Sequence, residues 1–245
     1  MDDVTAAKIL IRLLDLTSLN KDDTDARIEK LCQKAQTPYG NTAAVCIYPK
    51  FLRLAGQLLK GTGIKRATVV NFPDGGDNLP KLQDEIKEAL ELGADEIDTV
   101  FPYKNFLNGD EAACRRFLET AVRETGKKHA LKVILETGEI KKTSLIAQAT
   151  AMCIDAGAGF VKTSTGKTEV SATPEAANIM LETISSGRRN IGFKASGGIR
   201  TIEDAKKYLI LAQAVMGAKW VSPHTFRIGA SSLLDNLIEV IERGY

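Results

Sequence analysis

The sequence predicts an α/β protein with a single (β/α)8 TIM barrel, because eight short apolar segments alternate with stretches of helical period over 245 residues. The apolar segments are rich in β-branched residues and are expected to be strands beginning near residues 13, 43, 67, 96, 131, 159, 190 and 226. A doubly wound open sheet is the alternative, but it usually needs fewer strands at this length. No Gly-x-Gly-x-x-Gly turn follows the strand near Asn71, so a dinucleotide site is not supported.

The intervals between these strands carry apolar residues at helical spacing, with stripes over residues 28–35, 79–90, 114–121 and 233–241. A short helix precedes the first strand. Thr173 before Pro174 is typical of a helix start, and Thr201 with Asp204 resembles a capping box. Gly93 and Gly157 are expected to end helices just before the next strand.

Residues 217–225 interrupt the alternation. Gly217 to Val221 looks like a helix end followed by a strand, but only about four residues would then lead to Phe226, and a parallel crossover needs a dozen or more. We therefore expect Lys219 to Thr225 to be an excursion before the eighth strand. No Pro/Ser-rich linker divides the chain, which predicts one domain over residues 1–245.

The composition narrows the function classes. The 33 Lys and Arg nearly balance the 31 Asp and Glu, which argues against a nucleic-acid or anionic-membrane partner. No apolar run reaches the roughly 18 residues that cross a bilayer, and the N-terminus lacks the basic region of a secretion signal. The four cysteines form no close pair and no metal-ligand spacing. We expect a cytoplasmic protein without a metal or other cofactor.

Several predicted strands carry charged residues in mid-run, where a barrel interior is normally filled by branched apolar side chains. These residues are Asp15, Asp98, Lys132, Glu136, Lys162 and Lys194. An unpaired buried charge costs several kcal/mol, so such residues are rarely present for stability alone. Alternation along the strand places Lys132 and Glu136 on one face, and we expect them to form an ion pair with each other.

Lys162 and Lys194 lie 32 residues apart, which is one βα unit and places them on adjacent strands near the same mouth. Mutual repulsion and a low-dielectric wall lower the pKa of a lysine from its reference of about 10.4. A neutral buried amine is the nucleophile of Schiff-base catalysis, and Asp98 could keep the other lysine charged and relay a proton. The alternative is a purely structural network of both lysines with Asp98 and Glu136.

Small residues close the last three predicted strands, at residues 163–167, 196–198 and 229–232. Such residues let backbone amides approach an oxyanion, and the phosphate site of many barrels follows strands seven and eight. With Lys167 and Arg200 nearby, the sequence predicts a phosphate site at this mouth.

The same segments resemble the deoxyribose-phosphate aldolase family, and the match covers nearly the whole chain. The quoted motifs are residues 15–17 (DLT), 41–49 (NTAAVCIYP), 96–98 (EID), 160–167 (FVKTSTGK), 193–198 (FKASGG) and 229–232 (GASS). The lysine motif at 160–167 is specific, whereas the glycine-rich pieces alone would not be. Some relatives have proline and alanine after the second lysine, where this chain has Ala195 and Ser196.

The resemblance implies a class I aldolase, without a cofactor, that reversibly cleaves 2-deoxy-D-ribose 5-phosphate to D-glyceraldehyde 3-phosphate and acetaldehyde in deoxyribose catabolism. It implies that Lys162 forms the Schiff base, that Lys194 lowers the pKa of Lys162, and that Asp98 relays protons. It also implies a set of phosphate-binding residues, namely Gly166, Lys167, Gly197, Gly198, Gly229, Ser231 and Ser232. Family members are often dimers, so a homodimer is one expectation.

Three further residues are weaker candidates. Asp15 lies in the first motif, and Cys46 is either a small core residue or a reactive thiol near an aldehyde site. Relatives of this subtype end in a tail whose terminal tyrosine reaches the active site. This chain also ends in a tyrosine, Tyr245, but its tail after Leu234 is shorter. Tyr245 is therefore either a residue of the active site or an exposed terminus, and the two alternatives are equal.

Two other functions stay open at this point. Another phosphate-binding barrel enzyme, such as an isomerase or a transaldolase-like lyase, would use the same mouth. A catalytically silent sugar-phosphate sensor would bind the ester without turnover, although a sensor does not need two opposed lysines in its core.

Overall fold

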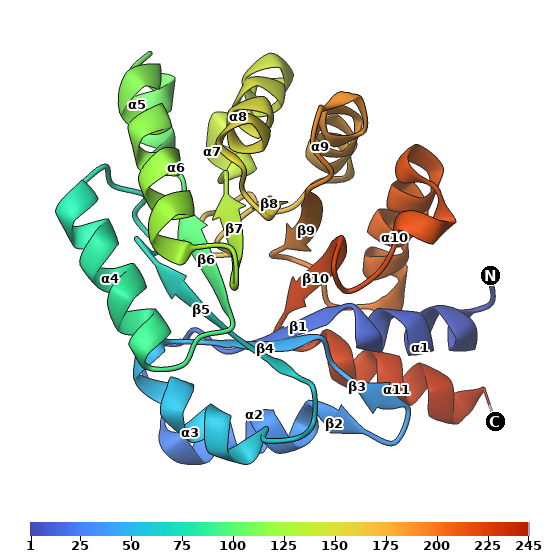
Figure 1. The fold of residues 1–245 in the computed structure, drawn as a ribbon. Coiled ribbons are helices and arrows are strands. Elements are labelled where there is room, and N and C mark those ends of the chain that lie inside the picture. The colour runs from blue at the N-terminus through green and yellow to red at the C-terminus, as the bar shows by residue number, and fades with distance from the viewer. Residues whose placement is uncertain (245) are drawn as a thin grey trace.

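The computed structural model describes residues 1–244, and eight of its strands close into a parallel barrel (Figure 1). Each of these strands pairs with the next along the chain, and the last closes on the first. They are β1 (Leu14–Thr17), β4 (Ala44–Ile47), β5 (Lys65–Val70), β6 (Glu96–Val100), β7 (Ala130–Ile134), β8 (Phe160–Lys162), β9 (Gly192–Ser196) and β10 (Phe226–Ala230). The predicted fold class is confirmed.

Helices surround the barrel, and α1 packs beside α11, close to where the described chain begins and ends (Figure 1). The helices are α1 (Asp3–Arg12), α2 (Asp25–Lys34), α3 (Leu52–Leu58), α4 (Leu79–Glu91), α5 (Tyr103–Leu107), α6 (Glu111–Thr125), α7 (Thr137–Ile140), α8 (Thr143–Ala156), α9 (Pro174–Ser186), α10 (Ile202–Met216) and α11 (Leu233–Arg243). Within residues 1–244, no helix is both long enough and apolar enough to span a bilayer.

The local signals in the sequence act as expected at the helix ends. The Thr173 side chain accepts a hydrogen bond from the third backbone N–H of α9, and Thr201 with Asp204 forms a complete capping box on α10. Gly157, with φ of +89°, follows α8 in the left-handed region, which ends the helix before β8.

Several short elements are additional to the eight alternating strands and helices. The segment before β10 forms a 3-10 helix (Ala218–Trp220) rather than a ninth barrel strand, as the short connection predicted. Strands β2 (Gln36–Thr37) and β3 (Gly40–Asn41) pair as a small antiparallel hairpin that the sequence analysis missed. Two-residue strands are too short to show a hydrophobic period.

The side chains of the barrel strands divide between two environments. Outward-facing residues such as Leu16, Ile47 and Val161 join the main apolar core between strands and helices. A separate cluster of small apolar side chains, lying on or beside β1, β4 and β5, consists of Leu19, Ala44, Cys46, Ala67 and Val69. The interior beside the remaining strands holds charged side chains, and they form the candidate site.

Candidate active site

Seven charged side chains from six strands meet inside the barrel, and all of them are buried. We call this set the barrel network; it consists of Asp15 (β1), Glu96 and Asp98 (β6), Lys132 (β7), Lys162 (β8), Lys194 (β9) and Arg227 (β10). Side chains at paired register positions of parallel strands point to the same face, which is why residues far apart in the chain meet here.

Asp98 is the centre of the barrel network. Its Oδ2 atom accepts hydrogen bonds from the Nζ atoms of Lys162, at 2.9 Å, and Lys194, at 2.8 Å. Its Oδ1 atom accepts one from Lys132 at 2.9 Å. Burial alone would raise the pKa of Asp98, but the three lysines outweigh burial and hold that pKa well below its ordinary value. Asp98 is therefore an ionised carboxylate that accepts hydrogen bonds from three lysines.

Lys194 has two carboxylate partners. Besides Asp98, its Nζ atom donates to Oδ2 of Asp15 at 2.5 Å. Burial lowers the pKa of Lys194, but the two carboxylates outweigh burial and raise the pKa above its ordinary value. Lys194 is therefore held as an ammonium ion. Asp15, which the sequence offered only as a secondary candidate, lies directly against it.

Lys162 has the fewest partners among the cations of the barrel network. Within residues 1–244 its Nζ atom meets one carboxylate oxygen, Oδ2 of Asp98, and it shares that oxygen with Lys194. Its side chain is 3% exposed. Lys162 lies at the carboxyl end of its strand, because β8 ends at this residue and the loop of residues 163–173 follows it.

Arg227 is a member of the barrel network that the sequence analysis missed. It donates to Oε1 of Glu96 at 2.8 Å and also to Asp15, so it joins β10 to β6 and β1 across the interior. Burial lowers the pKa of Arg227, but the two carboxylates raise it further above its ordinary value. The sequence could have identified Arg227 in the same way as the lysines, because it is a charged residue within an apolar strand.

The expected ion pair between Lys132 and Glu136 is wrong. Lys132 donates to Glu96 at 2.5 Å and to Asp98 at 2.9 Å. Strand β7 ends at Ile134, and Glu136 has φ of +58°, so the alternation of faces does not extend to it. The Glu136 carboxylate instead accepts hydrogen bonds from Thr165 and Thr168.

A cavity of about 230 Å³ lies at the carboxyl ends of β1, β8, β9 and β10, and we call it the mouth pocket. It is lined by six of the seven residues expected at the phosphate site, namely Gly166, Lys167, Gly197, Gly198, Gly229 and Ser231, and by Arg200. Ser232 does not line it, but lies next to it as the residue before α11.

The mouth pocket is built to receive an anion. Lys167 reaches across it to donate to the Leu19 carbonyl at 2.7 Å, and Arg200 adds a second cation. Gly197 and Gly198 both have positive φ, and a Cβ atom on Gly197 would lie 2.5 Å from the Cβ atom of Ser171. Backbone amides can therefore approach a ligand closely, and α11 begins at the same edge.

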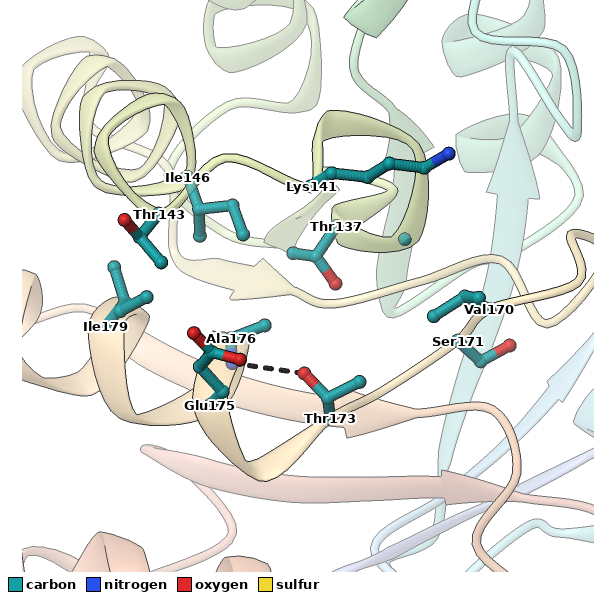
Figure 2. Close-up of a pocket in the computed structure, with 11 residues that line it drawn as sticks. Thr137, Lys141, Thr143, Ile146, Val170, Ser171, Thr173, Glu175, Ala176 and Ile179 are labelled. Atoms are coloured by element: carbon teal, nitrogen blue, oxygen red, sulfur yellow. Dashed lines mark hydrogen bonds between the residues drawn. The ribbon is translucent and has the colours of Figure 1, made fainter.

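A second cavity, of about 250 Å³, lies among α7, α8 and α9, and we call it the outer cavity (Figure 2). Thr137, Ile146, Val170 and Ile179 are among its lining residues. The mouth pocket, in contrast, adjoins the barrel network, because a Cβ atom on its lining residue Gly229 would lie 2.9 Å from Cε of Lys194. The mouth pocket is therefore the candidate active site.

The remaining candidates are placed as follows. Cys46 is buried in the small apolar cluster, and burial raises the pKa of its thiol, which favours the core interpretation. Tyr245 lies outside the described residues. Among residues 1–244, no group of three or more His, Cys, Asp or Glu side chains is arranged to hold a metal ion.

The chain is similar to known aldolases along nearly its whole length. The family described as DeoC/LacD family aldolase matches residues 9–237. A candidate deoxyribose-phosphate aldolase from Coccidioides immitis is 32% identical, with a TM-score of 0.85 over 96% of this chain and 86% of that one. A protein described as QR15, an aldolase, is 28% identical, with a TM-score of 0.82 over 96% and 97% of the two chains. The tetrameric deoxyribose phosphate aldolase from Aeropyrum pernix is 25% identical, with a TM-score of 0.75 over 100% and 98%.

Proposed function

Because this chain belongs to the DeoC/LacD family of aldolases, we propose that it is a class I aldolase acting on 2-deoxy-D-ribose 5-phosphate. The reaction would reversibly give D-glyceraldehyde 3-phosphate and acetaldehyde. The observation that carries the proposal is the place of Lys162, an amine with one shared carboxylate partner, at the end of β8, directly before the loop that supplies Gly166 and Lys167 to a pocket suited to phosphate.

The barrel network contains one basic side chain more than it has carboxylates. Four basic side chains face three carboxylates within the described residues. Arg227 stays charged because of its intrinsic basicity, and carboxylates raise the pKa of both Lys132 and Lys194. Lys162 has a single acceptor oxygen, which it shares with Lys194, and we therefore assign it the role of the nucleophile.

The neutral amine of Lys162 attacks the aldehyde carbon of the open-chain sugar, and the loss of water leaves an iminium ion. The C2–C3 bond then breaks, its electron pair moves into an enamine on Lys162, and the C3 hydroxyl loses its proton as the new aldehyde forms. Protonation of the enamine carbon and hydrolysis release acetaldehyde and restore the amine. No electrons enter or leave, so the cycle needs no redox partner.

Asp98 and Lys194 have separate tasks in this cycle. The iminium nitrogen keeps one N–H group, which donates to Asp98, so the new cation forms beside a fixed carboxylate. Lys194 is held charged at the same oxygen and is the nearest ammonium acid, from which a water molecule carries protons to and from the sugar. The 5-phosphate lies against Lys167, Arg200 and the glycine amides of the mouth pocket.

Reductive trapping tests the proposal directly. Borohydride with acetaldehyde should add about two carbons to one lysine, and peptide mass mapping should place them on Lys162. Addition to Lys194 would reverse the roles of the two lysines. An isomerase or a silent sugar-phosphate sensor would show no trapping that depends on acetaldehyde, and a coupled assay for glyceraldehyde 3-phosphate separates a sensor from an enzyme.

A further inference from the structure

Glu136 is a buried carboxylate that the mechanism above does not use. It follows β7 in the left-handed region, and although burial raises its pKa, the nearby charge of Lys162 lowers that pKa. Its hydrogen-bond partners in the described chain all belong to one segment, residues 163–173, which we call the β8–α9 loop. The carboxylate accepts hydrogen bonds from Thr165 N, at 3.3 and 3.4 Å, from Thr165 Oγ1 at 2.5 Å and from Thr168 Oγ1 at 3.2 Å.

These hydrogen bonds continue to the phosphate-binding lysine. The hydroxyl of Thr165 donates to Glu136 and accepts a hydrogen bond from the backbone N–H of Lys167 at 3.0 Å. Gly166, between them, has φ of +76° and makes the turn that brings both neighbours to the mouth pocket. The Glu136 carboxylate thus positions the Thr165 hydroxyl, and this hydroxyl positions the backbone of Lys167.

We propose that Glu136 is a positioning residue that holds the β8–α9 loop in the conformation in which Gly166 and Lys167 receive the phosphate group of the substrate. The inference rests on the proposed function for the identity of the substrate, but not for the presence of a phosphate-binding loop. Glu136 does not touch the substrate in this account, and it acts through Thr165.

Packing alone supports this loop poorly. Val170 and Ser171 border the outer cavity, which leaves about 250 Å³ unfilled between the loop and helices α7, α8 and α9 (Figure 2). The hydroxyl of Thr137, the residue after Glu136, is buried there without a hydrogen-bond partner in the described chain. A close contact lies beside it, because a Cβ atom on Gly138 would lie 1.9 Å from the Val170 carbonyl oxygen. The start of the loop is held by hydrogen bonds between Thr163 and Ser196, and Glu136 ties the stretch from Thr165 to Thr168 that follows.

The electrostatics fit a positioning role better than a ligand-binding role. A carboxylate facing the mouth pocket would repel a phosphate, whereas the Glu136 oxygens are occupied by three donor groups of the loop. Burial also raises the pKa of Glu136, against the hydrogen bonds from Thr165 that lower it. Its charge is therefore directed into the loop rather than toward the ligand.

The test compares Glu136→Gln with Glu139→Gln, a matched change three residues away on α7, at a side chain that makes no hydrogen bond to the loop in the described chain. Calorimetry with inorganic phosphate as the probe should show binding weakened about tenfold in Glu136→Gln, the scale of one lost charge-assisted hydrogen bond, and unchanged in Glu139→Gln. With 2-deoxyribose 5-phosphate, KM should rise with a smaller effect on kcat. With unphosphorylated 2-deoxyribose, kcat/KM should stay within about twofold.

Two further variants keep the inference testable if Glu136→Gln does not fold. Thr165→Val removes the hydroxyl between Glu136 and Lys167 and should reproduce the loss of phosphate affinity. Thr165→Ser keeps this hydroxyl and should have the phosphate affinity of the wild type. Equal losses with both sugars, or wild-type phosphate affinity in Glu136→Gln, would overturn the positioning role. If the wild-type protein binds phosphate but does not cleave the sugar, the proposed function fails and the positioning role of Glu136 is still measured.

Discussion

Lys162 and Lys194 donate to the same atom, Oδ2 of Asp98, and are directly paired in the register of β8 and β9. Their Nζ atoms are therefore within about 6 Å of each other, close enough for each charge to disfavour the other. The pair is asymmetric, because Lys194 has a second carboxylate, Asp15, and Lys162 has none in the described chain. This asymmetry supports the different roles proposed for the two lysines.

Replacing Lys162 with methionine should abolish trapping and reduce cleavage by at least about 1,000-fold, since the nucleophile is lost. The fold should survive, because the barrel network then holds three cations and three carboxylates. Urea unfolding and the coupled aldehyde assay measure both effects. Turnover near the wild-type rate, in a folded variant, would remove Lys162 from the mechanism.

Replacing Lys194 with methionine should lower kcat for cleavage by about 100-fold, because the ammonium acid of the proposed proton relay is lost. Trapping of acetaldehyde on Lys162 should persist, since the proposed nucleophile is unchanged. The coupled aldehyde assay and peptide mass mapping measure both effects, and a kcat equal to that of the wild type would remove Lys194 from the relay.

The two cavities can be told apart with one lysine from each. Lys167→Met removes a cation from the mouth pocket and should raise KM for the phosphorylated sugar by about tenfold or more. Lys141→Met makes the same change beside the outer cavity and should leave KM within about twofold. Steady-state kinetics of both variants is sufficient. The reverse result would place the sugar phosphate in the outer cavity.

Arg227 should matter for stability more than any exposed arginine. Arg227→Met leaves Asp15 and Glu96 with one fewer buried partner each and should lower the free energy of unfolding by about 3–5 kcal/mol. Arg115→Met breaks an exposed pair with Glu111 and should cost less than about 1 kcal/mol. Urea titrations at pH 7 give both values, and equal effects would mean that burial of the Arg227 pairs is irrelevant.

Glu136 also predicts a pH dependence of stability. Because burial raises its pKa in the folded protein, its stabilising contribution is complete below the unfolded pKa of about 4.3 and is lost as pH rises through the folded value. Relative to Glu136→Gln, the wild-type protein should therefore lose unfolding free energy as pH rises from about 4 toward 7. Asp15 should behave in the opposite way, because its cationic partners lower its pKa; its contribution is constant above the unfolded pKa of about 3.9 and is lost as pH falls below it. Denaturant titrations from about pH 4 to 7 check the sign for Glu136, and parallel curves for wild type and Glu136→Gln would contradict it.

The barrel and the meeting of the two lysines could be predicted because both follow from local spacing. Eight β-branched segments at regular intervals specify the strands, and the capping residues Thr173 and Thr201 specify where two helices begin. The 32 residues from Lys162 to Lys194 make one βα unit, so adjacency of the strands brings the side chains together. The residues of the mouth pocket follow from the ends of the same strands.

Only the tertiary structure decided which charge meets which. The interior partners of Lys194, Lys132 and Arg227 lie 34 to 212 residues away in the chain, and no local pattern distinguishes one carboxylate from another. Glu136 shows the limit most clearly: strand alternation directs it to Lys132, but a single positive φ after the strand end turns it into the β8–α9 loop. Spacing determines which segments become neighbours, whereas the direction of each side chain at a strand end depends on the packing around it.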